Sequence, residues 1–230
     1  MQIELFKGGF TETFRQGDIA QIMFFYDGAC EIRYQDGSAA VLSVPTSPYN
    51  SQYGVPVSSD GSMLFVADWD AGVSTYAVMS GRKIWSVSEK RIRNIDVFNG
   101  YIVMAKYNAA LLKADELTGK QIIQLKGRFS HSFRINDSHL LLETNGGTLC
   151  LVNTDELTIV KRYLQRVCNP EKFLSWCIQG AFVKDGKLSI YGFEQYPQGD
   201  YSNPEKHDFE RVIDSEVYAN KIGEKYGGGR

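Results

Sequence analysis

Cysteine is scarce in this sequence. The 230 residues include four cysteines that lie far apart in the chain: Cys30, Cys150, Cys168 and Cys177. Neither a CxxC pair nor a histidine at zinc-ligand spacing accompanies them, and disulfide frameworks and structural zinc sites depend on closely spaced ligands. We therefore expect free thiols, which behave as small apolar side chains when they are buried.

An excess of positive charge is also missing. The chain has 25 Lys and Arg against 27 Asp and Glu, a formal net charge of −2. Nucleic-acid and anionic-membrane binding require clustered Lys and Arg, so neither partner is expected. The opening MQIELFKGGF lacks the pattern of a secretory signal, and no apolar run is long enough to cross a membrane. We expect a cytoplasmic protein.

Recognisable catalytic motifs are absent. The sequence has no GxSxG nucleophile elbow, and its GGF and GGG stretches lack the strand, helix and lysine of a phosphate-binding loop. His131 and His139 are expected to be structural, with His131 bonded to backbone where a strand begins. The sequence therefore predicts no catalytic, cofactor-binding or metal-binding residue, and a protein that is not an enzyme.

Turn signals, in contrast, are plentiful and regularly spaced. Asp60–Gly61, Asn99–Gly100 and Asp137–Ser138 each separate two β-rich segments, and such dipeptides favour hairpin turns because they tolerate positive φ. Their second residues lie 39 and then 38 positions apart. A period near 40 with several short strands per unit is typical of propeller blades.

A repeated phrase follows the same period. AVMSGRKIW at 77–85 recurs as ADELTGKQI at 114–122 and in part as TDELTIVKR at 154–162. The preceding segments LFVA, IVMA and HLLLE are apolar on successive residues, as inner strands buried on both faces should be. Outer strands carry more charge, as edges that face water should. Helical repeats would need 3.6-residue periodicity, which residues 53–165 lack.

These repeats resemble a known family pattern. Thr75–Trp85 is similar to the phrase Y-A-x-x-x-G-K-x-x-W that ends many blades of quinoprotein-like and WD-repeat β-propellers. Lys113–Ile123 matches less well, and Val152–Arg162 matches in part because Ile159 replaces the glycine. The resemblance covers about half of the chain and implies an all-β fold, a small β-propeller, without implying a single function. It implies no quinone cofactor, because the stacking Trp residues and the metal site of those propellers cannot be placed in this sequence.

The period extends in both directions to about five four-stranded blades, in a single domain over residues 1–230. The last blade is irregular, because residues 195–208 are polar and contain two prolines, so we expect a long excursion there. IELFKG near the start is expected to complete this blade. FERVIDSEVYANKI is expected to be either a closing strand or a C-terminal helix.

Turns between the second and third strands of each blade gather on one face of a propeller. Here that face is expected to be acidic and aromatic, and ten residues form the candidate partner-binding set: Tyr26, Asp27, Asp68, Trp69, Asp70, Tyr107, Glu143, Tyr196, Asp200 and Tyr201. Aromatic side chains anchor protein interfaces, and clustered carboxylates attract a basic partner. The alternative is that Asp and Asn lie there only because tight turns require them.

These features predict a non-enzymatic propeller that binds another protein. The most concrete hypothesis is an immunity protein that neutralises a basic toxin or nuclease delivered by competing bacteria, with carboxylates taking the place of nucleic-acid phosphates. The alternative is a carbohydrate-active or small-ligand-binding five-bladed propeller that uses an axial pocket. Asp68, Asp70 and Glu143 are the candidate acids for that alternative.

Overall fold

The computed structural model describes residues 19–24, 29–43, 57–58, 60–145, 147–163, 175–198 and 200–213. Regular structure in these segments is entirely β, and none of them holds a helix that could cross a membrane. The strands, in chain order, are β1 (Ile19–Phe24), β2 (Ala29–Tyr34), β3 (Ala39–Ser43), β4 (Met63–Asp68), β5 (Gly72–Ala77), β6 (Lys83–Val87), β7 (Ile92–Val97), β8 (Tyr101–Lys106), β9 (Ala109–Asp115), β10 (Gln121–Asn136), β11 (His139–Thr144), β12 (Leu149–Asn153), β13 (Thr158–Tyr163), β14 (Ser175–Lys184), β15 (Lys187–Gln198) and β16 (Asp200–Val212).

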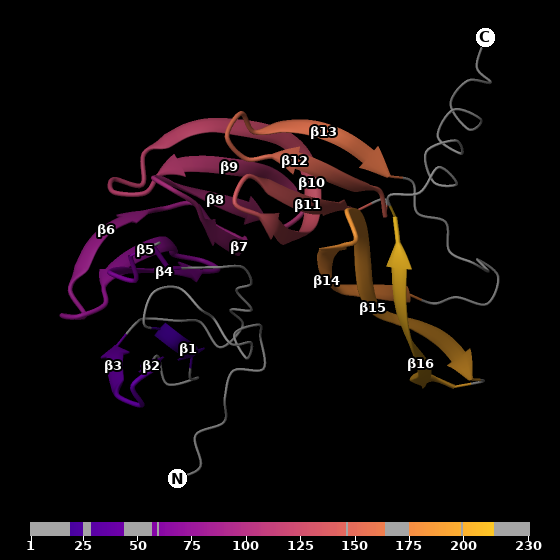
Figure 1. Ribbon diagram of the computed structural model, residues 1–230, viewed down its shortest axis with the longest axis horizontal. Coiled ribbons are helices and arrows are strands. Elements are labelled where there is room, and N and C mark those ends of the chain that lie inside the picture. Colours follow the sequence, from indigo (N-terminus) through magenta and orange to yellow (C-terminus); the bar gives the residue numbers. More distant parts are fainter. Residues whose placement is uncertain are drawn as a thin grey trace.

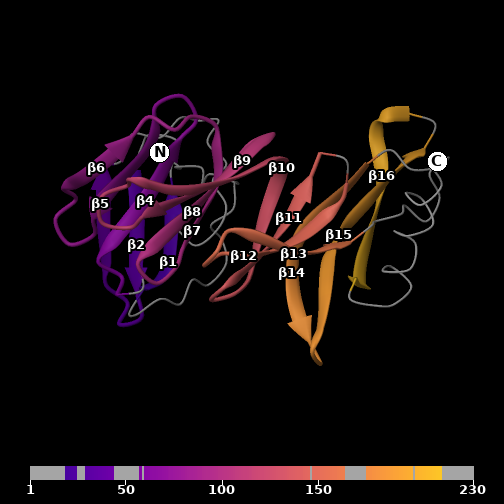
Figure 2. The same ribbon diagram turned by 90° about the horizontal axis from the view of Figure 1, so that it is seen from above.

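The strands pair into antiparallel units that follow one another along the chain. Strands β1–β3, β4–β6 and β14–β16 form the first, second and fifth units. The long strand β10 belongs to two units, because its first part pairs with β9 and its second part pairs with β11. The third unit is therefore β7, β8, β9 and the start of β10, and the fourth is the end of β10 with β11, β12 and β13. In Figure 1 and Figure 2 the units follow sequence order, with β6 and β16 at opposite ends of the molecule.

Apolar side chains pack between neighbouring units. Alternate residues of a strand point to opposite faces of its sheet, so β8 sends Ile102 and Met104 towards the second unit and Val103 and Ala105 towards the fourth. Comparable buried clusters join the first unit to the second and the fourth to the fifth. Among the described residues, no such cluster joins the fifth unit to the first. Stacked sheets with a core between each pair are the arrangement of propeller blades.

The all-β class is confirmed, but the inner strands were assigned wrongly from the sequence. IVMA and HLLLE lie in β8 and β11, which are second strands of their units. LFVA lies in β4, whose Leu64 pairs with Val57 of an earlier segment through an isolated bridge. The innermost strands of the third and fourth units are β7 and the end of β10. In the described part of the chain, four strands are present in these two units and three in each of the other sheets. A closed ring of five blades stays a prediction, and residues 3–8, expected to close it, lie outside the described residues.

The excursion expected at residues 195–208 is a hairpin instead. Strands β15 and β16 are paired along their length, from Ser189 opposite Val212 to Gln198 opposite Asp200. Proline is tolerated at bulges and on edge strands. Pro197 falls where the register shifts between Tyr196 and Gln198, and Pro204 lies on the edge strand β16. Phe209–Val212 of the C-terminal segment are strand, and its residues after 213 lie outside the described part.

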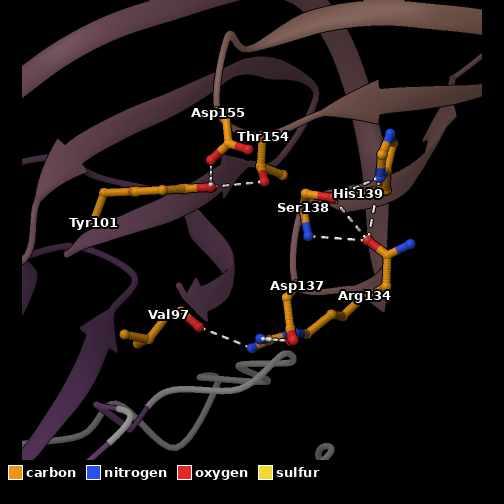
Figure 3. A network of polar contacts seen from close by, with 9 residues as sticks. Val97, Tyr101, Arg134, Asp137, Ser138, His139, Thr154 and Asp155 are labelled. Atoms are coloured by element: carbon orange, nitrogen blue, oxygen red, sulfur yellow. Dashed lines mark hydrogen bonds and ion pairs between the residues drawn. The ribbon is translucent and has the colours of Figure 1, made fainter. Parts of the chain in front are cut away.

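Buried and partly buried polar contacts connect the third unit to the fourth, as Figure 3 shows. The Tyr101 hydroxyl lies 2.9 Å from Thr154 Oγ1 and donates to Asp155 Oδ1 at 2.8 Å. Arg134 of β10 donates from Nη1 to the Val97 carbonyl at 2.8 Å. Burial of the phenol raises the pKa of Tyr101 to about 12. The two units are therefore joined by directional bonds as well as by apolar packing.

The repeated phrase also makes contacts between units. Trp85 of β6 donates from Nε1 to the Glu116 carbonyl at 3.1 Å, and its ring covers Gly119, whose φ is +69°. A Cβ at Gly119 would lie 2.7 Å from this ring, so the glycine makes room for the tryptophan. In the third copy of the phrase Leu157 takes the left-handed conformation (φ 54°) and is buried between the third and fourth units. Residues of each copy of the repeated phrase thus lie at a contact between neighbouring units, which gives the repeat a structural role.

The expectation of free thiols is confirmed where the structure describes them. Cys30, Cys150 and Cys177 form no disulfide, and Cys168 lies outside the described residues. Burial raises the pKa of Cys30 to about 12. Native Cys30 is therefore a poor nucleophile.

Candidate functional site

Turns between second and third strands lie at one end of the sheets, together with the segments that lead into the first strands. We call this surface the aromatic face and define it as residues 68–71, 88–93, 106–108, 128–131 and 143–145. Antiparallel pairing places these segments together, because each second strand ends where its third strand begins. The β15–β16 turn lies at the corresponding end of the fifth unit.

Backbone hydrogen bonds run along the aromatic face from the second unit to the fourth. Arg91 donates to the Trp69 carbonyl at 2.9 Å, and Tyr107 donates to the Arg91 carbonyl at 2.8 Å. Asn108, with φ 54°, donates to the Phe129 carbonyl at 2.8 Å, and Asn145 donates to the Arg128 carbonyl at 3.2 Å. Each turn is therefore bonded to the segment that starts a first strand, so the loops are held in fixed positions.

Two predicted aromatic residues meet on this framework. The rings of Trp69 and Tyr107 lie 5.6 Å apart at an interplanar angle of 51°. Arg93 of β7 places its guanidinium 5.5 Å from the centre of the Tyr107 ring. Trp69 is partly exposed and Tyr107 is 36% exposed. Second and third units thus jointly present a Trp–Tyr–Arg cluster to solvent, and Arg93 is a member that the sequence reasoning missed.

The two aspartates beside Trp69 differ in role. Asp68 Oδ1 accepts hydrogen bonds from the backbone N–H groups of Asp70, at 2.9 Å, and Ala71, at 2.7 Å. This is the turn-forming function that short acidic side chains commonly have, so the structural alternative applies to Asp68. Asp70 is exposed, and its carboxylate is available at the edge of the aromatic cluster.

Glu143 pairs with a histidine rather than with the aspartates. His131 Nδ1 lies 2.9 Å from Glu143 Oε2, and the Glu143 side chain is only 11% exposed. His131 therefore contacts a carboxylate, which the sequence did not lead us to expect. Burial raises the pKa of nearby Cys177, the charge of Glu143 adds to this rise, and Arg93 and Lys206 oppose it. Charges of the third, fourth and fifth units thus act on the Cys177 thiol.

The aromatic face, over the segments that define it, carries charges of both signs, and the prediction of an acidic face stays a prediction because Asp27 and Asp200 lie outside these segments. Its defined segments contain five Lys and Arg residues against four Asp and Glu: Lys90, Arg91, Arg93, Lys106 and Arg128, against Asp68, Asp70, Glu89 and Glu143. Lys106 and Glu89 form an ion pair at 2.8 Å. Most of these cations lie in segments leading into first strands, which the sequence reasoning did not assign to this face. The net charge of these segments therefore gives no preference for a basic partner.

A cleft of about 450 Å³ opens beside the aromatic face, between strands β9 and β10 of the third unit and Glu89. Its polar lining includes Glu89, Lys106, Gln121, Gln124, Lys126 and Arg128. Three cations and one carboxylate suit a small anionic ligand with hydrogen-bond acceptors. This cleft is lined by β9, β10 and the end of β8, which are the third, fourth and second strands of the third unit. The ligand site predicted from the sequence was instead a pocket on the propeller axis.

The remaining candidates are not brought together by described contacts. Tyr26 and Asp27 lie outside the described residues. Tyr196 lies near the end of β15, and Asp200 and Tyr201 are the first residues of β16. For these three residues the structure describes the backbone alone. Within the described segments, no group of three or more His, Cys, Asp or Glu side chains is arranged to hold a metal ion.

Comparisons with known proteins identify the fold. No protein-family model and no curated protein matches the sequence. The solved β-propeller domain of Cps50 (Swd1) from Myceliophteria thermophila is similar, with a TM-score of 0.57 and 14% identity over 92% of this chain and 76% of that one. BamB from Moraxella catarrhalis is also similar, with a TM-score of 0.58 and 13% identity over 93% of this chain and 62% of that one. This chain thus spans less than two thirds of BamB, and at such identities the likeness shows the fold alone: the chain is a β-propeller.

Proposed function

We propose that this chain is a non-enzymatic propeller that binds another protein through the aromatic face. The observation that carries the proposal is the partly exposed Trp69–Tyr107–Arg93 cluster. Trp, Tyr and Arg are the residue types most enriched among those that dominate binding energy at interfaces. Backbone bonds to Trp69 and Tyr107 hold the loops in place, and a preorganised surface loses less conformational entropy on binding.

The test is partner capture with a double variant, Trp69→Ala and Tyr107→Ala. Tagged wild-type chain and variant are incubated with lysate of the source cells, and bound proteins are quantified by mass spectrometry. We expect every specifically bound protein to fall at least about tenfold in the variant, as hot-spot truncation costs 2 kcal/mol or more. Met79→Ser is the matched control, because Met79 is 89% exposed in a turn at the other end of the sheets. Equal recovery with the double variant contradicts the proposal.

A finer version of the proposal is a cytoplasmic immunity protein whose partner is a basic toxin or nuclease. It is supported locally by Asp70, an exposed carboxylate next to Trp69. A basic partner should be lost from the capture when salt rises from about 0.05 to 0.5 M, since the Debye length shrinks severalfold. Asp70→Asn should weaken its capture, whereas Asp137→Asn at the other end of the sheets should not. Capture that is insensitive to both changes contradicts the basic-partner version and leaves the protein-binding proposal standing.

Small-ligand binding is a second candidate function, and the polar cleft beside Glu89 favours it. A bound anion would stabilise the native state by mass action. Citrate, phosphate and a neutral sugar such as maltose are suitable probes in a thermal unfolding scan. We expect citrate or phosphate to raise the unfolding temperature of wild type and not of Lys126→Gln with Arg128→Gln. A shift with maltose alone would favour the carbohydrate alternative instead.

A further inference from the structure

The outermost strands of the second, third and fourth units share an irregularity. In β6, β10 and β13 the pairing register skips one residue, and the residues left out are Ile84, Ile122 and Val160. All three are β-branched apolar residues with exposed side chains, at 42%, 58% and 58%. A bulge places an extra residue outside the ladder, so each of these blades directs one such residue out of its hydrogen-bonded ladder. We call these three residues the rim row.

Single exposed apolar residues are ordinary on protein surfaces. The rim row differs because the same feature recurs at the same place in three consecutive units. A bulge on an edge strand protects the edge against pairing with another strand, but this protection does not require an apolar side chain. A charged residue at the bulge would blunt the edge equally well. The apolar character of all three positions therefore points to a contact surface.

The rim row lies in a cationic environment. Strands β6 and β13 and the first part of β10 (121–126) contain four basic residues, Lys83, Lys126, Lys161 and Arg162, and no Asp or Glu. The whole chain, in contrast, has a net charge of −2. Positive charge is therefore concentrated along these outermost strands, and charge complementarity calls for an acidic partner.

Three kinds of occupant fit these observations poorly. A strand added by backbone pairing meets a bulge on each edge, which interrupts the ladder it would extend. A second copy of this chain docking rim to rim would oppose like charges. A flat anionic lipid surface would touch a curved rim over a short stretch, and β6 and β13 follow the outer side of the arc in Figure 1.

We propose that the rim row binds an extended acidic segment of a second protein, with apolar side chains of that segment packed on Ile84, Ile122 and Val160. A flexible chain can follow the rim from one blade to the next. Acidic side chains of the segment would pair with the basic residues of the outermost strands. The proposal does not depend on the aromatic face, because the two surfaces share no residue and call for different partner chemistry.

The experiment uses a fluorescein-labelled peptide of about 16 residues that repeats Glu-Leu-Glu-Pro, in which proline favours an extended form of roughly 3.1 Å per residue. Fluorescence anisotropy measures its binding to the full chain, to the triple variant Ile84→Thr, Ile122→Thr, Val160→Thr, and to the charge variant Lys83→Glu, Lys161→Glu. Threonine keeps the β-branch and so suits the bulge. Val183→Thr is the control, since Val183 is 53% exposed on β14, outside the rim row. Circular dichroism and the unfolding midpoint establish that each variant is folded.

We expect the peptide to bind wild type and the control alike. The triple variant and the charge variant should each weaken binding by about tenfold or more, and a peptide with Ser in place of Leu should bind correspondingly less. Failure of the acidic peptide to bind wild type overturns the proposal, as does equal binding by the triple variant. Equal binding of a Lys-Leu-Lys-Pro peptide also overturns it. Binding only to phosphatidylserine vesicles, in a sedimentation assay, would replace the protein segment with a membrane.

Discussion

At the scale of single residues, the contact between Trp85 and Gly119 shows how one blade docks onto the next. Gly119→Ala puts a side chain at a φ of +69° and a Cβ 2.7 Å from the Trp85 ring. Left-handed backbone costs a non-glycine residue about 1–2 kcal/mol, and overpacking costs about 1–3 kcal/mol. We expect a combined loss of about 2–5 kcal/mol in the free energy of unfolding, measured by urea denaturation.

Gly100→Ala separates the two contributions. Gly100 has a φ of +81°, but nothing lies within 4 Å of a Cβ built there. The loss in free energy of unfolding for Gly100→Ala should therefore be limited to the backbone cost of about 1–2 kcal/mol. If the two alanine variants lose the same stability, the Trp85 ring yields without cost and the docking contact is weaker than we infer.

Tyr101 makes stability depend on pH above the neutral range. Burial raises its pKa to about 12, so the folded state keeps the phenol protonated where an unfolded tyrosine, near pKa 10, is already ionised. This contribution is fully present below pH 10 and is lost as pH rises from about 10 to 12. Tyr101→Phe should be less stable by about 1 kcal/mol at pH 7, through the missing hydrogen bonds. It should also lose less stability than wild type between pH 9.5 and 11. Urea denaturation at these pH values is the measurement, and an unchanged slope in the variant would contradict the assignment.

At the scale of elements, Lys113 of β9 fastens the third unit to a turn of the fourth. Its Nζ donates to the Thr154 carbonyl at 3.1 Å and the Asp155 carbonyl at 2.6 Å, and lies 3.6 Å from the centre of the Tyr101 ring. Burial lowers the pKa of Lys113, while the charge of Asp155 opposes this shift. Lys113→Met removes these contacts and should cost about 2–3 kcal/mol in urea denaturation. Lys120→Met, at an exposed position, should change stability by less than about 0.5 kcal/mol, and a similar loss in both variants would contradict the role of Lys113.

Second and third strands could be predicted from the sequence, whereas first strands could not. Gly61 and Gly100 do adopt positive φ in their turns, as the dipeptide pattern indicates. Strand β7 escaped prediction because its apolar residues lose their alternation at the register shift between Ile92 and Asn94, and because buried Asn94 and Asp96 interrupt them. Asn94 donates from Nδ2 to the Ser132 carbonyl of β10 at 2.9 Å, a contact between units that the sequence does not reveal.

The same omission explains which residues near the candidate site were missed. Trp69 and Tyr107 were expected on one face because they occupy turns between identified strands, and their rings lie 5.6 Å apart. Arg91 and Arg93 were missed because Arg91 leads into β7 and Arg93 lies in it. The sign of the surface charge therefore depended on a strand that the pattern did not show. Pairing of Glu143 with His131 was likewise hidden, because these two residues face each other across β10 and β11 next to a register shift between Phe129 and His131.

At the scale of the whole molecule, the clusters between units form a series. Cys30 lies in the cluster between the first and second units, and Cys150 lies between the third and fourth. In repeat proteins stability is approximately a sum over neighbouring units, so terminal units open more easily than interior ones. We expect Cys30 to become reactive at a lower urea concentration than Cys150, in a Cys168→Ser, Cys177→Ser background. Maleimide labelling followed by mass spectrometry measures both thiols. Identical labelling curves would show that the blades open together.

The backbone hydrogen bonds of the aromatic face have a consequence for redesign. They connect Trp69, Arg91 and Tyr107 through amide and carbonyl groups, which every residue except proline supplies in full. Side chains at exposed positions of these loops can therefore be exchanged without loosening the scaffold. A combinatorial library randomised at positions 70, 90 and 107 should consist largely of folded members, from which new recognition specificities can be selected.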